Sequence, residues 1–239
     1  EVYYAAVLSK DKFLQQAFID KLDFHSYVAK QMFNLSCDIS DVKKYYANER
    51  QYAKAITFGI MYQAGPAKIA ETVNKDAAEG EEITKAQSSQ FINKYFREAK
   101  SLKRFIDDSN RQIENHAFIY SHFGRKRRLL ESKSPNKGVA SHAIRSGVNF
   151  LVQSVASDIN LLGVIDLIDW IEQTGYQDDI LPFTVVHDSI VSEVRADLID
   201  TYVENAKACI QKDRGLSIPN CPIKVDFEVG PSWGELSDY

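Results

Sequence analysis

The chain has 239 residues, of which 44% are hydrophobic and 26% are charged, and its formal net charge is −4. This composition suits a globular protein of one large or two modest domains, and it excludes a generally basic nucleic-acid binder, so any contact with a polyanion must come from local patches. Three cysteines without a C-x-x-C pair argue against a disulfide framework or a zinc site and indicate a reducing compartment.

The sequence carries no membrane-spanning or targeting signal. Uninterrupted apolar stretches fall short of about 18 residues, which predicts no membrane-spanning segment, and there is no signal-peptide pattern. The sequence begins at Glu1, without a methionine, directly in the apolar run VYYAAVL. Because natural domains seldom begin inside an element, we expect a fragment or a processed half of a longer protein.

The first half of the chain is predicted to be helical. Residues 1–36 have helical apolar spacing with a break near Asp23, and residues 37–41 resemble a connection. A helix follows that carries Arg50 to Tyr62 and ends near 63–66. A short helix at 68–73, an acidic loop at 76–82 and long helices over 84–114 complete this half.

The second half is predicted to mix helix and strand. Residues 117–130 form an extended segment with a glycine turn and a basic cluster, 132–138 form a loop, and 142–171 form a long helix. Residues 181–194 indicate a hairpin with His187, Asp188 and Ser189 at its tip, and 222–229 alternate like a half-buried strand. The fold class is therefore α+β with a helical subdomain.

One helix face carries the strongest functional signal. Arg50, Lys54, Phe58 and Tyr62 are each four residues apart, so they share one surface of a helix with about 3.6 residues per turn. Two cations followed by a ring and a phenol could hold a triphosphate at one end and stack a base at the other. The alternative is an ordinary amphipathic helix with a basic solvated edge.

Three further groups are weaker when each is taken alone. Asp188 at a hairpin tip is a rigid mount for a metal ligand, or simply a turn former. The residues Arg145, Asn149 and Gln153, again four apart, form a polar face that either binds a ligand or is satisfied by neighbouring backbone. The cations of FGRKRRLL at 123–130 either grip a polyanion or form a solvated loop.

Taken together and in this order, these motifs resemble the polymerase domain of family A (Pol I-like) DNA polymerases over essentially the whole chain. The α-helical pattern R-x-x-x-K-x-x-x-F-G-x-x-Y is similar to the nucleotide-binding motif B, and VVHDS to motif C. The R-x-x-x-N-x-x-x-Q helix, GRKRR, DFHSYVA at 23–29 and the ending VDFEVGPSWGEL also match, and EVYYAAVLSKD resembles the tail of motif A.

The resemblance implies a right-hand polymerase fold with a helical fingers subdomain and an antiparallel-sheet palm. Residues 1–22 would be palm with the tail of motif A, 23–130 fingers, and 131–239 palm with the motif C hairpin and a C-terminal strand. The thumb and the first part of the palm would be absent from this chain.

The resemblance also implies roles for individual residues. The triphosphate would be held by Arg50, Lys54 and His25, while Phe58 would pack on the incoming nucleotide and Tyr62 would lie near the templating base. Glu1 would help to exclude a ribose 2′-hydroxyl. Asp188 would be the catalytic metal ligand, and the primer–template contacts would be Arg127, Arg145, Asn149, Gln153 and His187.

The sequence departs from the family in three places. The first catalytic aspartate of motif A would lie upstream of Glu1, so two Mg²⁺ ions would be shared between Asp188 and a carboxylate outside this chain. We therefore expect a second chain or an N-terminal segment that carries this aspartate and the thumb, and no polymerisation by these residues alone. Ser189 replaces a frequent glutamate, which should tune the rate, and Gln63 replaces a glycine.

The function implied is template-directed addition of dNTPs to a primer 3′-hydroxyl, with primer–template DNA and dNTP as partners and no membrane. Two alternatives stay open: a single-subunit RNA polymerase, and a catalytically inactive DNA-binding remnant. The expected location is the cytoplasm of a bacterial or phage-infected cell, or another reducing compartment that contains DNA.

Overall fold

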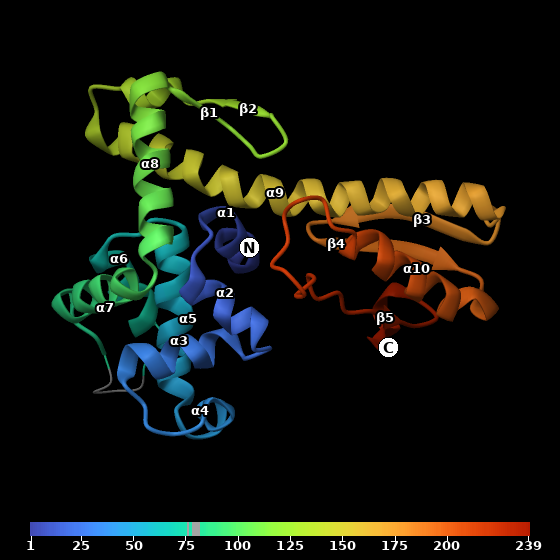
Figure 1. Cartoon of the computed structure of the whole chain (residues 1–239), viewed down its shortest axis with the longest axis horizontal. Helices are drawn as coiled ribbons and strands as arrows, with labels where there is room; N and C mark the ends of the chain where they lie inside the picture. Colours follow the sequence, from blue (N-terminus) through green and yellow to red (C-terminus); the bar gives the residue numbers. More distant parts are fainter. Residues whose placement is uncertain (76, 78–81) are drawn as a thin grey trace. The chain divides into compact units, whose positions relative to one another are not determined.

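The computed structural model describes residues 1–75, 77 and 82–239, and these divide into two compact units, residues 1–153 and 154–239. The long helix α9 (Lys137–Thr174) contributes to both units (Figure 1). Most of the acidic loop expected at 76–82 lies outside the described residues. Each unit has its own buried side chains.

Unit 1, residues 1–153, is mainly helical. The break expected near Asp23 is confirmed, because one helix ends at Ile19 and the next begins at Phe24. The segment 37–41, expected to be a connection, instead runs into a short helix. The helices are α1 (Val2–Ser9), α2 (Lys12–Ile19), α3 (Phe24–Phe33), α4 (Ile39–Tyr45), α5 (Ala47–Met61), α6 (Pro66–Asn74), α7 (Lys85–Glu98) and α8 (Lys100–His116).

A buried carboxylate fixes where two of these helices begin. One oxygen of Asp11 accepts a hydrogen bond from the backbone N–H of Leu14 at 3.2 Å, in the first turn of α2. Its other oxygen accepts from the N–H groups of Ser101 and Leu102 at 2.8 and 3.0 Å, in the first turn of α8. Because the first N–H groups of a helix lack intrahelical partners, one side chain here satisfies donors of two helices.

Helix α5 packs against α3, α6 and α7, and its buried face carries Ala53, Ile56 and Ile60. Gly59 lies against Ile69 of α6 so closely that a Cβ atom there would be 2.5 Å from the Ile69 Cγ1 atom. Any larger residue would force the Ile69 side chain or one of the two helices to shift. The opposite face of α5 is thereby left for the four residues singled out by the sequence.

A small antiparallel hairpin follows α8, formed by β1 (Phe118–Tyr120) and β2 (Lys126–Arg128). It confirms the extended segment predicted at 117–130. Gly124 in its turn has a φ of +80°, a conformation that favours glycine. Gly147 of α9 sits directly against the side chains of Leu129 and Ile113, so α9 lies tightly on the base of this hairpin and on α8.

Unit 2, residues 154–239, contains the end of α9, the hairpin β3 (Ile180–Val186) and β4 (Ser189–Val194), and α10 (Ile199–Gln211). The hairpin confirms the prediction for 181–194, with His187 and Asp188 forming its turn and Ser189 beginning β4. The core of unit 2 consists of buried side chains from α9, β3, α10 and the segment between β4 and α10, namely Leu167, Ile171, Ile180, Leu198 and Ala206.

The strand predicted at 222–229 is mostly wrong. Only β5 (Glu228–Val229) is a strand, paired with β6 (Ser237–Asp238), and residues 222–227 have no regular structure. Apolar alternation decides which side chains face a core, but a strand also needs a neighbouring backbone to pair with. Within the described residues, 222–226 pair with no neighbouring backbone, and Phe227 accepts a single backbone hydrogen bond, from the N–H of Tyr239 at 3.0 Å.

Within the described residues, helix α9 alone is long and apolar enough to cross a membrane when length and composition are the only criteria. The core helix of a soluble protein passes the same test, so this finding weighs little. Polar residues such as Asn149 and Gln153 interrupt the apolar runs of this helix.

Candidate active site

The face predicted on α5 is present in the structure. Arg50, Lys54 and Phe58 lie within the helix, and Tyr62 is the residue that ends it. Lys54 is exposed and Phe58 is half-buried, while 39% of Tyr62 is accessible to solvent. A cationic end and an aromatic end therefore share one accessible surface.

The cationic end of this face includes an acid that the sequence reasoning had not assigned. Nε and Nη2 of Arg50 donate to the two oxygens of Asp23 at 2.8 and 2.9 Å, a bidentate pair. Asp23 also begins α3, because its Oδ1 atom accepts a hydrogen bond from the N–H of Ser26 at 2.8 Å. These bonds to Arg50 and Ser26 hold the pKa of the Asp23 carboxyl well below its usual range, against the opposing effect of burial.

His25 lies on the first turn of α3, and its ring centroid is 5.8 Å from that of Phe58. Burial, with a smaller contribution from the charges of Arg50 and Lys54, lowers the pKa of His25, although nearby Asp23 acts in the opposite direction. The imidazole is therefore neutral at pH 7. Its buried Nδ1 atom has no hydrogen-bond partner among the described residues.

The aromatic end of the face is linked to the start of the chain. The Tyr62 hydroxyl donates a hydrogen bond to Oε2 of Glu1 at 2.9 Å, and Nε2 of Gln153 lies 3.5 Å from the same hydroxyl. Burial and the bond to Glu1 raise the pKa of Tyr62, so the phenol keeps its proton. Three residues predicted for separate roles are thus brought together from α5, α9 and the N-terminus.

Helix α9 carries Arg145, Asn149 and Gln153 at intervals of four, so all three share one face as predicted. Asn149 presents a buried Oδ1 atom without a hydrogen-bond partner in the described part of the chain. Arg127 of β2 folds onto this helix, with Nη2 donating to Oγ of Ser146 at 2.7 Å. Its guanidinium also lies 5.4 Å from the ring centroid of Phe150.

The cations beside Arg127 are arranged differently. Arg125, Lys126 and Arg128 are exposed, and the Lys126 ammonium lies 3.9 Å from the ring centroid of Phe118 and 5.6 Å from that of Tyr120. The hairpin therefore combines exposed cations with aromatic rings, a combination typical of nucleic-acid-binding surfaces.

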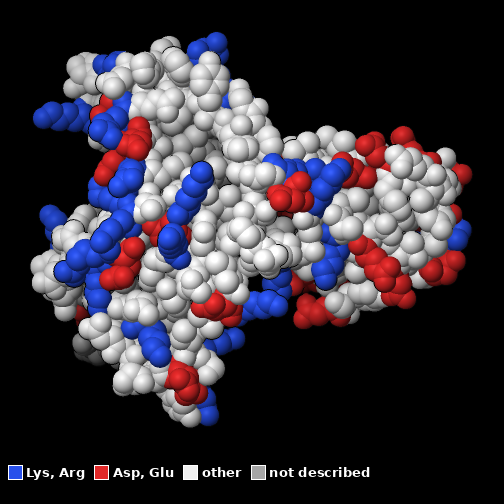
Figure 2. All heavy atoms as spheres, in the orientation of Figure 1, with Lys and Arg blue, Asp and Glu red and all other residues white. Residues whose placement is uncertain are grey.

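The two units carry opposite net charge. Residues 1–153 hold 24 lysines and arginines against 17 aspartates and glutamates, and residues 154–239 hold 5 against 16. Figure 2 shows the basic side chains spread widely over unit 1, and acidic ones prevailing on unit 2. The net charge of −4 for the whole chain conceals a basic unit that is suited to a polyanion.

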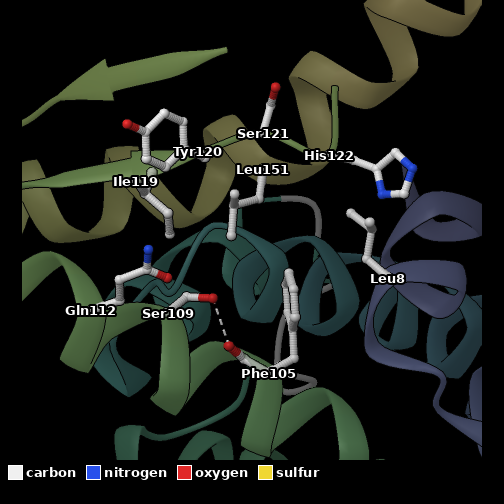
Figure 3. A pocket seen from close by; sticks show the side chains of 9 residues that line it. All are labelled: Leu8, Phe105, Ser109, Gln112, Ile119, Tyr120, Ser121, His122 and Leu151. Carbon is white, nitrogen blue, oxygen red and sulfur yellow. Dashed lines mark hydrogen bonds between the residues drawn. The ribbon is translucent and has the colours of Figure 1, made fainter. Parts of the chain in front are cut away.

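A small open pocket of about 250 Å³, which no sequence pattern predicted, lies in unit 1 between α1, α8, β1 and α9. Figure 3 shows Leu151, Ile119 and Phe105 around it, with Gln112 and His122 at its sides. No predicted site residue lines it, and we assign it no role.

His187 and Asp188 belong to unit 2, where both are exposed in the turn between β3 and β4. His187 has a φ of +56°, in the left-handed region that a tight hairpin turn requires. Among the described residues there is no group of three or more His, Cys, Asp or Glu side chains that could hold a metal ion. Asp188 fits a single carboxylate ligand but does not form a complete metal site with other described residues.

Comparisons with known proteins identify the family of this chain. The profile of DNA polymerase family A matches residues 1–235. The DNA polymerase of Escherichia phage T5 is 50% identical over 243 aligned residues, which cover 95% of this chain and 28% of that polymerase. DNA polymerase I of Caldicellulosiruptor bescii is 28% identical over 235 residues, covering 98% of this chain and 26% of the relative.

Among solved structures, the POL domain of Pol1 from M. smegmatis in complex with DNA primer-template and dNTP matches with a TM-score of 0.79 and 22% identity. The match covers 93% of this chain and 36% of that one. The structure therefore has the α+β right-hand polymerase fold. The family match confirms the resemblance: the chain belongs to DNA polymerase family A. It spans about a quarter of the length of the two relatives named above.

Proposed function

We propose that this chain is the C-terminal part of a polymerase domain that performs template-directed DNA synthesis. The observation that carries the proposal is the accessible face of α5, where two cations, a half-buried phenylalanine and a hydrogen-bonded tyrosine follow one another. Membership of family A and coverage of about a quarter of the relatives support it. A second chain or an N-terminal segment would supply the thumb, the first palm strands and the first catalytic aspartate.

The nucleotide would bind along α5 with its triphosphate toward Arg50 and Lys54. Phosphoryl transfer asks a protein mainly for positioning and for neutralisation of charge, and charge-assisted hydrogen bonds from these cations provide both. His25, neutral at pH 7, would donate one further hydrogen bond. Phe58, tilted against the His25 ring, would pack on the base or sugar.

Discrimination between sugars would depend on Glu1 and Tyr62. Their hydrogen bond fixes the Glu1 carboxylate beside the aromatic end of the face. A carboxylate already engaged in this way leaves little room for a 2′-hydroxyl, which favours deoxynucleotides over ribonucleotides. This is the reason to prefer a DNA polymerase over a single-subunit RNA polymerase.

Asp188 would be the catalytic carboxylate and would hold Mg²⁺ together with an acid from outside this chain. When bound, two such ions neutralise developing charge on the transferring phosphoryl group and favour the attacking 3′-hydroxyl. The two-residue turn places Asp188, which is exposed, at the end of the hairpin. Asp188 itself would accept and orient the cation.

The primer–template would lie on Arg145, Asn149 and Gln153 through its minor groove. A·T and T·A pairs present the same acceptors there, so donors can check pair geometry without reading sequence. Arg127, with the exposed hairpin cations, would contact phosphates, and His187 would contact the primer end. The excess of basic residues in unit 1 supports this assignment.

Three subdomain assignments accompany the proposal: residues 1–22 as palm, 23–130 as fingers and 131–239 as palm. The protein would act in the cytoplasm of a bacterial or phage-infected cell, on DNA and dNTP, without a membrane. The phage T5 and bacterial relatives support this location.

The proposal is tested with a chimera in which residues 1–239 replace the matching part of the phage T5 polymerase. We expect Mg²⁺-dependent primer extension with dNTP, a strong preference over ribonucleotides, and loss of at least a thousandfold in rate on Asp188→Asn. Asp178→Asn, a matched change at another exposed aspartate of unit 2, should leave the rate unchanged. A well-folded chimera that binds primer–template but never extends it would support the inactive remnant instead.

A further inference from the structure

We propose that Asp23 is a positioning residue for the polymerase reaction. It holds the Arg50 guanidinium in one orientation toward the triphosphate of the incoming nucleotide. This inference rests on the proposed function. It concerns a residue outside the set of nucleotide contacts assigned above.

The geometry of the pair supports positioning rather than blocking. Asp23 engages Arg50 side-on, through Nε and Nη2, at 2.8 and 2.9 Å. A guanidinium has five N–H donors, so this arrangement leaves the two on Nη1 and one on Nη2 for another anion. A bidentate fork also fixes the plane of the guanidinium, which a single hydrogen bond does not.

Asp23 is itself held in place. Its Oδ1 atom accepts from the N–H of Ser26 at 2.8 Å as the cap of α3, and α3 packs against α5. The carboxylate is therefore anchored to one helix while it orients a side chain of the next. The pair is only partly exposed, with 24% of the Arg50 side chain and 43% of the Asp23 side chain accessible.

The same carboxylate has an opposing effect, because its negative charge repels a triphosphate. Removing the charge should therefore strengthen or leave unchanged the binding of the nucleotide in its ground state, while the released arginine no longer meets the transition state in a fixed orientation. Immobilising a long side chain carries an entropic cost that corresponds to about a threefold to tenfold effect on rate. The two effects fall on different kinetic parameters.

Asp23→Asn separates the pair from the cap, since asparagine caps a helix about as well as aspartate but cannot form the charged fork. In the chimera described above, we expect kcat to fall about threefold to tenfold while KM for dNTP stays level or falls. Asp38→Asn is the matched control: Asp38 is the exposed cap residue of α4, without a side-chain capping bond, and the change should alter neither parameter.

A double-mutant cycle gives the decisive result. In an Arg50→Lys background the fork is already lost, so adding Asp23→Asn should change kcat by less than twofold. An equal fall in kcat in both backgrounds, or a rise in KM with kcat unchanged, would overturn the inference. If Asp23→Asn lowers kcat only in proportion to a loss of folded protein measured by circular dichroism, the role is structural and the inference is wrong.

These outcomes are distinct from failure of the proposed function. An inactive wild-type chimera would count against the function, whereas an active chimera that is indifferent to Asp23→Asn would count only against the positioning role. Asp23→Ala, which removes both cap and fork, should lower the melting temperature as well as kcat. Its comparison with Asp23→Asn separates the two contributions.

Discussion

The close approach of α5 to α6 offers a test of how the proposed nucleotide-binding face of α5 is supported. A Cβ atom at Gly59 would lie 2.5 Å from Cγ1 and 2.7 Å from Cδ1 of Ile69, whose side chain is fully buried. The Cγ1 atom of a β-branched residue in a helix moves only if χ1 changes, which its neighbours resist. Gly59→Ala should therefore force the two helices apart.

The expected magnitude follows from two opposing contributions. Overpacking of this kind costs about 1–3 kcal/mol, and alanine regains up to about 1 kcal/mol of helix propensity over glycine. A net loss of about 1–2 kcal/mol lowers the melting temperature of a domain of this size by roughly 3–6 °C. The assay is thermal unfolding followed by circular dichroism at 222 nm.

Two further variants make the result specific. Gly65→Ala is the control for steric overlap, because nothing lies within 4 Å of a Cβ atom there and its φ of −71° suits alanine; any loss of stability there reflects only the poorer N-cap that alanine gives α6. Ile69→Ala alone should cost about 2–5 kcal/mol by opening a cavity, and the Gly59→Ala methyl should refill part of it. The double variant Gly59→Ala/Ile69→Ala should therefore lose less stability than the two single variants lose in total. Strict additivity, or a Gly59→Ala melting temperature within 1 °C of wild type by this assay, would refute the reasoning.

Three other predictions concern pH, salt and backbone strain. Burial lowers the pKa of His25, so as the pH falls the unfolded chain binds a proton at this residue before the folded chain does. The free energy of unfolding, measured by urea denaturation, should therefore fall below about pH 6.5, and the fall should be smaller in His25→Gln. Lys126→Ala should reduce the slope of log K against log salt for DNA binding by about 1, whereas Lys207→Ala, in the acidic unit, should not. Gln63 has a φ of +51° and accepts a hydrogen bond from Asn110 at 3.0 Å. Gln63→Gly and Gln63→Ala both lose that bond, so they differ only in the backbone strain at this position. Gln63→Gly should be more stable than Gln63→Ala by about 1 kcal/mol, and equal free energies of unfolding in urea would contradict the strain.

The sequence was sufficient wherever one element determines the outcome. The face from Arg50 to Tyr62 follows from helical periodicity alone, because the four residues are on the same helix or at its end. The hairpin around Asp188 follows from two apolar runs separated by a short polar turn. Such local patterns do not depend on what the rest of the chain does.

Contacts between elements could not be predicted in this way. Asp23 and Arg50 are 27 residues apart, and Gln63 and Asn110 are 47 apart, so no periodicity relates them. The sequence pattern at Asp23 is an acid that precedes a helix, and this pattern predicts only that Asp23 caps the N-terminus of α3. Its second role becomes visible when α3 is packed on α5. The failed strand at 222–229 has the same cause, since pairing depends on a distant backbone.

The negative charge of Asp23 needs an explanation, because unit 1 otherwise has an excess of basic residues. A nucleotide and a nucleic acid are both polyanions, and unit 1, where both are proposed to bind, holds 24 lysines and arginines against 17 aspartates and glutamates. A fixed acid beside the proposed triphosphate site would weaken binding, yet Asp23 lies there, with both of its oxygens hydrogen-bonded to Arg50. A site selected only for affinity would have no use for that charge. Its presence is understandable if orientation of Arg50 in the transition state matters more than attraction in the ground state, because only interactions that strengthen toward the transition state raise kcat.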